Sequence, residues 1–362
     1  MTSSPGRGLL HLAAAIDQEA AHDAGSYVEL ARLAEGGGLD FVTLDDTFAR
    51  PGLDALAVLS RVAPATSRVG LVPTVTTTHT EPFHVQAAVA TLDSASRGRA
   101  GWRIDVSTSE GEARLFGRRH AAPADELWQE AGEVADVAAR LWDSWEDDAE
   151  IRDVATGRFI DRDKLHHVDF EGTGFTVKGP SIVPRPPQGH PVRVVDATDA
   201  PARRTAARYA DVALIRAASP AQAAAVRDRL RSAAAEFGRA PGTPRVLASI
   251  VVDLGDGEHA AERGHGGGGP RQTAQGPLYR GGPVDLAELI ASWHADGVVD
   301  GFHLTPTEPR RDLERLVNGT VALLQHRGLF RTFYPGSTLR EHLGLARPAN
   351  RYAVPAGTGG AS

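Results

Sequence analysis

The sequence predicts an α/β fold, a (β/α)8 TIM barrel. Short apolar runs rich in β-branched residues alternate with longer Ala-, Arg- and Glu-rich stretches of helical spacing, which is the pattern of parallel strands joined by helices. Eight runs of each kind are present, the number that closes a barrel. The length of 362 residues also fits, because barrels with insertions reach this size as one unit.

The strands are short enough to be read as buried sheet strands. They are expected at Leu9 to Ile16, Phe41 to Leu44, Val69 to Val75, Arg99 to Val106, Val192 to Ala197, Val212 to Ile215, Val246 to Val252 and Gly301 to Leu304. The helices are expected at Tyr27 to Glu35, Asp54 to Val62, Pro82 to Ser94, Asp125 to Trp142, Ala200 to Tyr209, Ala221 to Phe237, Leu286 to Ala295 and Asp312 to His326. Pro82 and Pro201 fall near first turns, where proline is tolerated.

An open, doubly wound sheet is the alternative architecture. A dinucleotide site in such a sheet uses a Gly-x-Gly-x-x-Gly turn between a strand and a helix. No such turn occurs between any predicted strand and helix. The barrel is therefore favoured.

Two stretches interrupt the alternation. Residues 143–190 are acidic at the start and rich in Gly and Pro at the end, which indicates an insertion between the fourth helix and the fifth strand, of the kind that sits over one barrel mouth. Residues 255–283 contain ten glycines and are expected to be mobile. We expect residues 1–345 to form one domain and residues 346–362 to form a flexible tail.

Composition excludes several classes of function. The chain carries 39 Lys and Arg against 46 Asp and Glu, a net charge of −7, and no basic run that could follow a nucleic-acid backbone. It has no cysteine, which excludes disulfides, thiolate metal sites and cysteine nucleophiles. No segment has the length of apolar sequence that spans a bilayer, and the first apolar stretch is too short for a secretory signal. The protein is expected to be soluble and cytoplasmic, with no membrane or nucleic-acid partner.

Candidate functional residues lie at the carboxyl ends of the predicted strands, where parallel barrels carry their sites. Polar residues occur there at Asp45 and Asp46, Thr74 to His79, Asp105 to Ser109, Asp196 to Asp199 and His303 to Thr305. The Asp45–Asp46 pair has a second interpretation, because aspartates after strands commonly cap the next loop.

His11 and His79 are the candidate catalytic residues. His79 ends a run of three threonines that could line a mouth. His11 lies early in the first strand, where a histidine paired within the core is the alternative. His166 and His167 lack an acidic residue at metal-ligand spacing, so no metal site is expected.

Several strings resemble the luciferase-like flavin monooxygenases. They include Asp40 to Thr47, Thr76 to His84, and T-L-D-S-A-S-R-G-R-A-G-W-R from Thr91 to Arg103. Further strings begin at Leu141, Val177 and Arg327, so the resemblance covers nearly the whole chain. Within that superfamily, the chain is most similar to the nitrilotriacetate and dibenzothiophene-sulfone monooxygenase branch.

The resemblance implies a TIM barrel that takes reduced FMN from a separate flavin reductase and uses O2 to oxygenate a small organic substrate. It also implies a homo-oligomer, expected to be a dimer. Two alternatives remain open. One is the deazaflavin F420 in place of FMN. The other is a barrel that has lost flavin and acts as a non-catalytic binding or partner subunit.

The resemblance also assigns cofactor-binding positions residue by residue. Asp46 and Thr76 fall where the family places a strand-end aspartate and a hydroxyl near the flavin. Arg103 stands where an asparagine usually follows the Gly-Trp pair. The cofactor-binding residues implied are Asp46, Thr76, Arg103, Trp128, Thr198 and Ala200.

The positions implied for the FMN phosphate depart from the family pattern. Ala124 and Trp128 align with a histidine and a tyrosine, and the turn from Ala197 to Pro201 lacks the family's glycine and serine. These replacements remove a hydroxyl, an imidazole and a phenol, which are phosphate donors. Asp199 adds a negative charge to the same region.

Overall fold

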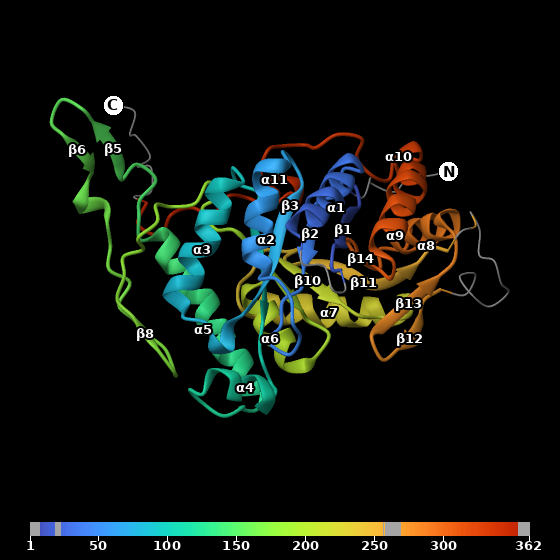
Figure 1. Cartoon of the computed structure of the whole chain (residues 1–362), viewed down its shortest axis with the longest axis horizontal. Helices are drawn as coiled ribbons and strands as arrows, with labels where there is room; N and C mark the ends of the chain where they lie inside the picture. The colour runs from blue at the N-terminus through green and yellow to red at the C-terminus, as the bar shows by residue number, and fades with distance from the viewer. Residues whose placement is uncertain (1–7, 19–22, 256, 258–268, 354–362) are drawn as a thin grey trace, which may run out of the picture.

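The barrel is closed by eight parallel strands. A computed structural model describes residues 8–18, 23–255, 257 and 269–353 (Figure 1). The barrel strands are β1 (His11–Ala15), β2 (Phe41–Leu44), β3 (Gly70–Thr76), β4 (Gly101–Asp105), β9 (Val192–Asp196), β10 (Val212–Ile215), β11 (Arg245–Asp253) and β14 (Gly301–Pro306). They pair in this order, and β14 pairs back to β1. The predicted TIM barrel and all eight predicted strands are confirmed.

Helices cover the outside of the barrel. They are α1 (Ala24–Gly36), α2 (Ala55–Val62), α3 (Pro82–Ala95), α5 (Ala124–Asp143), α6 (Ala200–Tyr209), α7 (Pro220–Glu236), α8 (Pro283–Ala295) and α9 (Pro309–Arg315). A π-helical turn at Leu316–Val321 joins α9 to α10 (Ala322–His326). Two short helices were not predicted from the sequence, α4 (Glu110–Phe116) and α11 (Leu339–His342).

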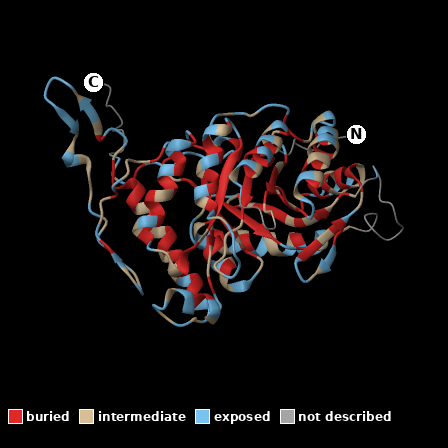
Figure 2. Cartoon of the chain, viewed as in Figure 1, coloured by how far each residue is buried: buried red, intermediate tan, exposed pale blue. Residues whose placement is uncertain are grey.

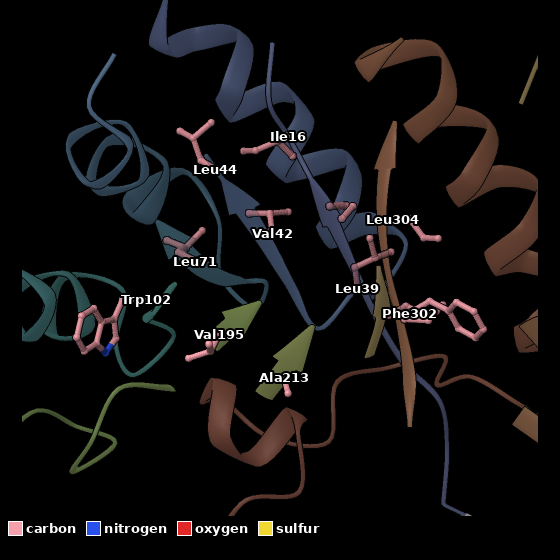
Figure 3. Packing of buried hydrophobic residues seen from close by; sticks show 14 of the residues in the cluster. Ile16, Leu39, Val42, Leu44, Leu71, Trp102, Val195, Ala213, Phe302 and Leu304 are labelled. Carbon is pink, nitrogen blue, oxygen red and sulfur yellow. The ribbon is translucent and has the colours of Figure 1, made fainter. Parts of the chain in front are cut away.

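The two faces of each barrel strand have different neighbours. Apolar residues that point outward, such as Val42, Leu71 and Phe302, belong to one large buried cluster with the helices (Figure 3). Burial is concentrated in the strands and the inner helix faces (Figure 2). Packing of this kind is the main source of stability in a barrel.

The inward faces change character along the barrel. At the amino end they are apolar, with Phe41, Val72 and Leu247 in a second cluster. Leu339 and Leu343, in and beside α11, belong to the same cluster and close that end. Further along the same faces are Thr43, Arg103 and His303, because side chains on one face recur every two residues. The polar end is therefore the carboxyl end.

The predicted insertion is present between α5 and β9. It contains the hairpin β5 (Glu150–Asp153) and β6 (Arg158–Ile160), a 3-10 turn at Arg162–Lys164, and the pair β7 (Phe170–Glu171) and β8 (Thr176–Val177). The β5–β6 hairpin stands away from the barrel helices (Figure 1). The base of the insertion is held to α3, where the Ser181 hydroxyl donates to Gln86 Oε1 at 3.1 Å.

The glycine-rich range contains an element that its composition did not indicate. Strands β12 (Arg271–Thr273) and β13 (Gly276–Arg280) form an antiparallel hairpin, and β13 continues the sheet beside β11. Residues 271–273 and 276–280 have strand partners in the described structure, and mobility of the stretch at 255–283 stays a prediction. Residues 256 and 258–268 of that range lie outside the described residues.

Part of the predicted flexible tail is held against the insertion. The Asn350 side chain is buried, and its Nδ2 donates to the carbonyl oxygens of Asp143 and Trp145 at 3.0 and 2.8 Å. Arg347 pairs with Asp147 at 2.6 Å. These contacts hold part of residues 346–353 in place, residues 354–362 lie outside the described residues, and the flexibility of the tail stays a prediction. Among the described helices, none is long and apolar enough to cross a membrane.

Candidate active site at the carboxyl end of the barrel

A cavity of about 320 Å³ opens at the carboxyl ends of β4 and β9. Its walls come from these two strands, from the starts of α5 and α6, and from the residue after β10. The β12–β13 hairpin forms the remaining wall. The lining residues are Arg103, Ile104, Asp105, Trp128, Asp196, Thr198, Asp199, Ala202, Arg216, Gln272, Ala274 and Gly276. The cavity is thus polar on one side and closed by the hairpin on the other.

Arg103 is the central cation of this end of the barrel. It points inward from β4, since Trp102 and Ile104 beside it belong to the outward cluster. Its guanidinium lies 2.5 Å from Asp45 Oδ1 and 3.9 Å from Asp105 Oδ2. Burial lowers the pKa of Arg103, but the carboxylates of Asp45 and Asp105 outweigh that effect and raise the pKa. Arg103 therefore stays charged, and both carboxylates lie on the side of its Nη2 atom.

Acidic groups outnumber the cations around Arg103. The backbone N–H of Asp45 donates to Asp17 Oδ1 at 2.6 Å. Burial raises the pKa of Asp17, and burial also raises the pKa of Asp105 despite the nearby Arg103. The raised pKa values of these two carboxyl groups mean that the nearby cations only partly offset the cost of burying a charged carboxylate.

A second ion pair forms the far wall. Arg216 Nη2 lies 2.9 Å from Asp196 Oδ2. The Thr198 hydroxyl donates to Asp196 Oδ1 at 2.6 Å and accepts from the Arg216 N–H at 3.0 Å. These contacts hold the loops after β9 and β10 against each other.

Below the cavity, the barrel interior holds a buried histidine. His303 Nε2 lies 2.8 Å from Thr43 Oγ1, and its Nδ1 lies 3.1 Å from Ser249 Oγ. Burial lowers the pKa of His303 to about 3, so the imidazole is neutral at neutral pH. Thr74 Oγ1 is also buried and has no hydrogen-bond partner among the described residues.

Helix α4 lies over the neighbouring part of the mouth and is anchored by Glu112. This carboxylate accepts from the hydroxyls of Ser107, Ser109 and Thr47 at 2.7, 3.0 and 3.0 Å. Burial alone would raise the pKa of Glu112, but these hydrogen bonds lower it.

The structure brings three of the predicted cofactor-binding residues to the cavity. Arg103, Trp128 and Thr198 line it. Trp128 is buried in the first turns of α5, and its carbonyl accepts from Thr205 on α6 at 2.8 Å, which joins the two helices at this wall. Ala200 begins α6, two residues before Ala202 on the wall. Cofactor binding by these residues stays a prediction.

Thr76 and His79 lie at the carboxyl end of β3 but not on the cavity wall. Thr76 ends the strand and is paired in register with Asp105. His79 stacks on Phe116 of α4, with ring centroids 4.5 Å apart. Burial lowers the pKa of His79, so the ring is mainly neutral at neutral pH. A catalytic role for His79 stays a prediction.

Two predicted residues are placed differently from the expectation. Asp46 Oδ2 accepts from the N–H of Ala55, the first residue of α2, at 2.9 Å, whereas Asp45 is the aspartate that reaches Arg103. His11 begins β1 at the amino end of the barrel, where its Nδ1 lies 3.1 Å from Asp40 Oδ1. His11 therefore lies at the end of β1 opposite the mouth, and a catalytic role for it stays a prediction.

Sequence reasoning missed several wall residues. Arg216 follows the strand that ends at Ile215, so the strand-end rule could have found it. Asp196 was noted as a strand-end residue but was not assigned to the site. Gln272, Ala274 and Gly276 gave no signal, because a hairpin was not expected in a glycine-rich range. Among the described residues, no group of three His, Asp or Glu side chains could hold a metal ion.

Comparison with known proteins gives consistent matches over most of the chain. A family model described as luciferase-like monooxygenase matches residues 8–325. N-acetyl-S-(2-succino)cysteine monooxygenase of Bacillus subtilis is 31% identical, over 90% of this chain and 91% of the relative. Nitrilotriacetate monooxygenase component A of Aminobacter aminovorans is 30% identical, over 91% of each chain. The crystal structure of long-chain alkane monooxygenase superimposes with a TM-score of 0.84 at 22% identity, covering 94% of this chain and 96% of that one.

Proposed function

The chain belongs to the luciferase-like monooxygenase family, and we propose that it is the oxygenase component of a two-component system. In this role it takes reduced flavin, FMN in the prediction from sequence, from a separate flavin reductase and uses O2 to oxygenate a small organic molecule. The relatives named above are monooxygenases, and one of them is described as a component A.

The observation that carries the proposal is the position of the cavity. It lies at the carboxyl mouth of the barrel, and its walls come from β4, β9, α5, α6 and the β12–β13 hairpin. This is the end at which barrel enzymes carry their sites. The apolar cluster sealed by Leu339 and Leu343 closes the opposite end. Water therefore cannot reach the cavity through the amino end of the barrel.

The residues present offer good partners to the uncharged part of a flavin. Hydroxyl, carboxylate and guanidinium groups converge on one wall, and Trp128 gives an aromatic surface on another. The residues do not fit the phosphate of FMN. Both arginines on the wall are paired with aspartates, and Asp199 adds an anionic carboxylate.

The chain's own residues have definable tasks in this role. Arg103 and Arg216 hold the wall in one arrangement through their ion pairs, so the cavity is pre-organised before a ligand enters. Asp105 faces the cavity with a pKa raised by burial, so it is a group that holds or releases a proton there. The hairpin residues Gln272 and Ala274 cover the outer side.

A non-catalytic partner subunit is the second candidate function. The observation that favours it is the pairing of both cavity arginines with aspartates, which reduces the net positive charge that a flavin phosphate would meet. The same pairing also disfavours F420, because that cofactor carries phosphate and carboxylate groups.

Flavin reoxidation kinetics test the proposed function against the second candidate. Free reduced flavin reacts with O2 and releases hydrogen peroxide. An oxygenase component in excess over reduced flavin should change the rate of reoxidation and lower the early yield of peroxide. Stopped-flow absorbance and a peroxide assay measure both quantities. A rate and a peroxide yield identical to those of free flavin, for both FMN and riboflavin, would favour the non-catalytic role.

A further inference from the structure

We infer that this cavity selects a flavin without a phosphate group, so that riboflavin binds more tightly than FMN. The inference rests on the proposed function, because it names the form of flavin that the same site takes. It depends on the charges along the cavity wall.

Both cations on the wall are already paired with carboxylates, each through its Nη2 atom. Arg103 is shared between Asp45 and Asp105, and Arg216 is held by Asp196. Among the described residues that line the cavity, no other side chain is cationic. Arg203 lies close by on α6 but does not line the cavity. Its Nε and Nη2 donate to the carbonyl oxygens of Ala197 and Thr198.

The wall itself carries more acids than bases. Asp105, Asp196 and Asp199 line it, against Arg103 and Arg216. Asp45, which binds Arg103 from the side of β2, increases the acidic excess. A phosphate dianion in this cavity would lie near at least one carboxylate whose charge is not offset, and like charges in a partly buried space repel strongly.

The helix terminus at the wall does not provide a replacement phosphate site. Helix N-termini bind anions through free backbone N–H groups and the helix dipole. At the start of α6, Pro201 has no N–H, so only the backbone N–H groups of Ala200 and Ala202 precede the first intrahelical hydrogen bond, which Arg203 donates to the Asp199 carbonyl. The N-cap residue is Asp199, whose carboxylate makes no capping hydrogen bond. An anion already stands where a phosphate would approach.

Uncharged ligand groups meet no such penalty. The ribityl hydroxyls of riboflavin are donors as well as acceptors, so they can bind the Asp105, Asp196 and Asp199 carboxylates that line the wall. Riboflavin and FMN share the ring and the ribityl chain and differ only in the terminal phosphate. The difference in their affinities therefore isolates the contribution of the phosphate.

Anaerobic equilibrium dialysis of the full-length protein against reduced riboflavin and reduced FMN tests the inference. We expect riboflavin to bind at least about tenfold more tightly, a difference of about 1.4 kcal/mol. Asp199→Asn should strengthen FMN binding severalfold and leave riboflavin binding unchanged. The matched control is Asp228→Asn. It removes one negative charge from an exposed side chain on α7 that does not line the cavity.

A second measurement needs no variant. Raising the salt concentration from about 0.05 M to about 0.5 M should bring the Kd of FMN closer to the Kd of riboflavin. The reason is that salt screens the repulsion between the phosphate and the wall carboxylates. Tighter binding of FMN than of riboflavin would overturn the inference and leave the proposed function in place. No saturable binding of either flavin would overturn both. Riboflavin preference with no response to Asp199→Asn or to salt would overturn the electrostatic basis.

Discussion

The guanidinium of Arg103 on β4 meets the carboxylate of Asp45, which follows β2, across the carboxyl end of the intervening strand β3. This ion pair links strands that are not hydrogen-bonded neighbours. It lies beside the cavity wall and is shielded from water on the Arg103 side, where the side chain is 17% exposed. The pair therefore sets both the shape and the charge of the mouth.

Replacing Arg103 should be costly, because it leaves Asp45 and Asp105 without their shared cation. We expect Arg103→Gln to lower the free energy of unfolding by about 1–3 kcal/mol at pH 8, which is less than for a fully buried pair because Asp45 and Asp105 are 33% and 41% exposed. The loss should be smaller at pH 5, because burial raises the pKa of Asp105 and the unpaired carboxyl group becomes protonated as the pH falls. Urea denaturation at the two pH values measures this.

Arg50→Gln is the matched control for that prediction. Arg50 pairs with the same Asp45 but is 71% exposed, and exposed pairs contribute less than about 1 kcal/mol. Equal destabilisation by the two substitutions would contradict the central position assigned to Arg103.

His303 should make the fold sensitive to acid. Its pKa in the folded state is about 3, below the ordinary value of about 6.5 in the unfolded chain. Between these two pH values the unfolded chain binds more protons, so stability falls as the pH falls. His303→Gln should remove this contribution, so that its unfolding free energy declines less than that of the wild type between pH 7 and pH 5. A parallel decline would exclude His303 as a source.

Asn350 should anchor the end of the described chain to the insertion. Asn350→Ala removes two buried hydrogen bonds and leaves the carbonyl oxygens of Asp143 and Trp145 without this donor. We expect a loss of about 1–3 kcal/mol. Thermal unfolding measures it. Arg351→Ala, an exposed neighbour, should change stability little. If both variants behave like the wild type, residues 347–352 do not dock in solution as they do here.

The barrel was predictable because its strands leave a strong signal. A parallel strand buried on both faces is a short, nearly continuous apolar run, and Phe41 to Leu44 was predicted with the bounds that β2 has. Helix α4 and the β12–β13 hairpin were not predictable in this way. Helix α4 has seven residues, and the hairpin depends on tertiary pairing with β11 within a glycine-rich range.

The site was predictable only in part, for a geometric reason. The strand-end rule places a residue at the mouth but does not tell which of two neighbours points inward. Asp45 and Asp46 were both candidates, and alternation turns Asp45 toward Arg103 and Asp46 toward α2. His11 shows a second limit of prediction from sequence. Whether a strand residue can reach the mouth depends on the end of the strand at which it lies, and His11 is the first residue of β1.

The most direct test of the proposed function is an anaerobic titration of reduced riboflavin and reduced FMN, compared between the wild type and Ala274→Trp. Ala274 is exposed in the β12–β13 turn and lines the cavity, so a tryptophan there should narrow the entrance without disturbing the core. The neighbouring turn residue Gln275 does not line the cavity, and Gln275→Trp is the control. We expect saturable binding of reduced flavin to the wild type and to Gln275→Trp, and weaker binding to Ala274→Trp. Failure of the wild type to bind either reduced flavin at concentrations up to about 1 mM, the Kd of a very weak complex, would contradict it.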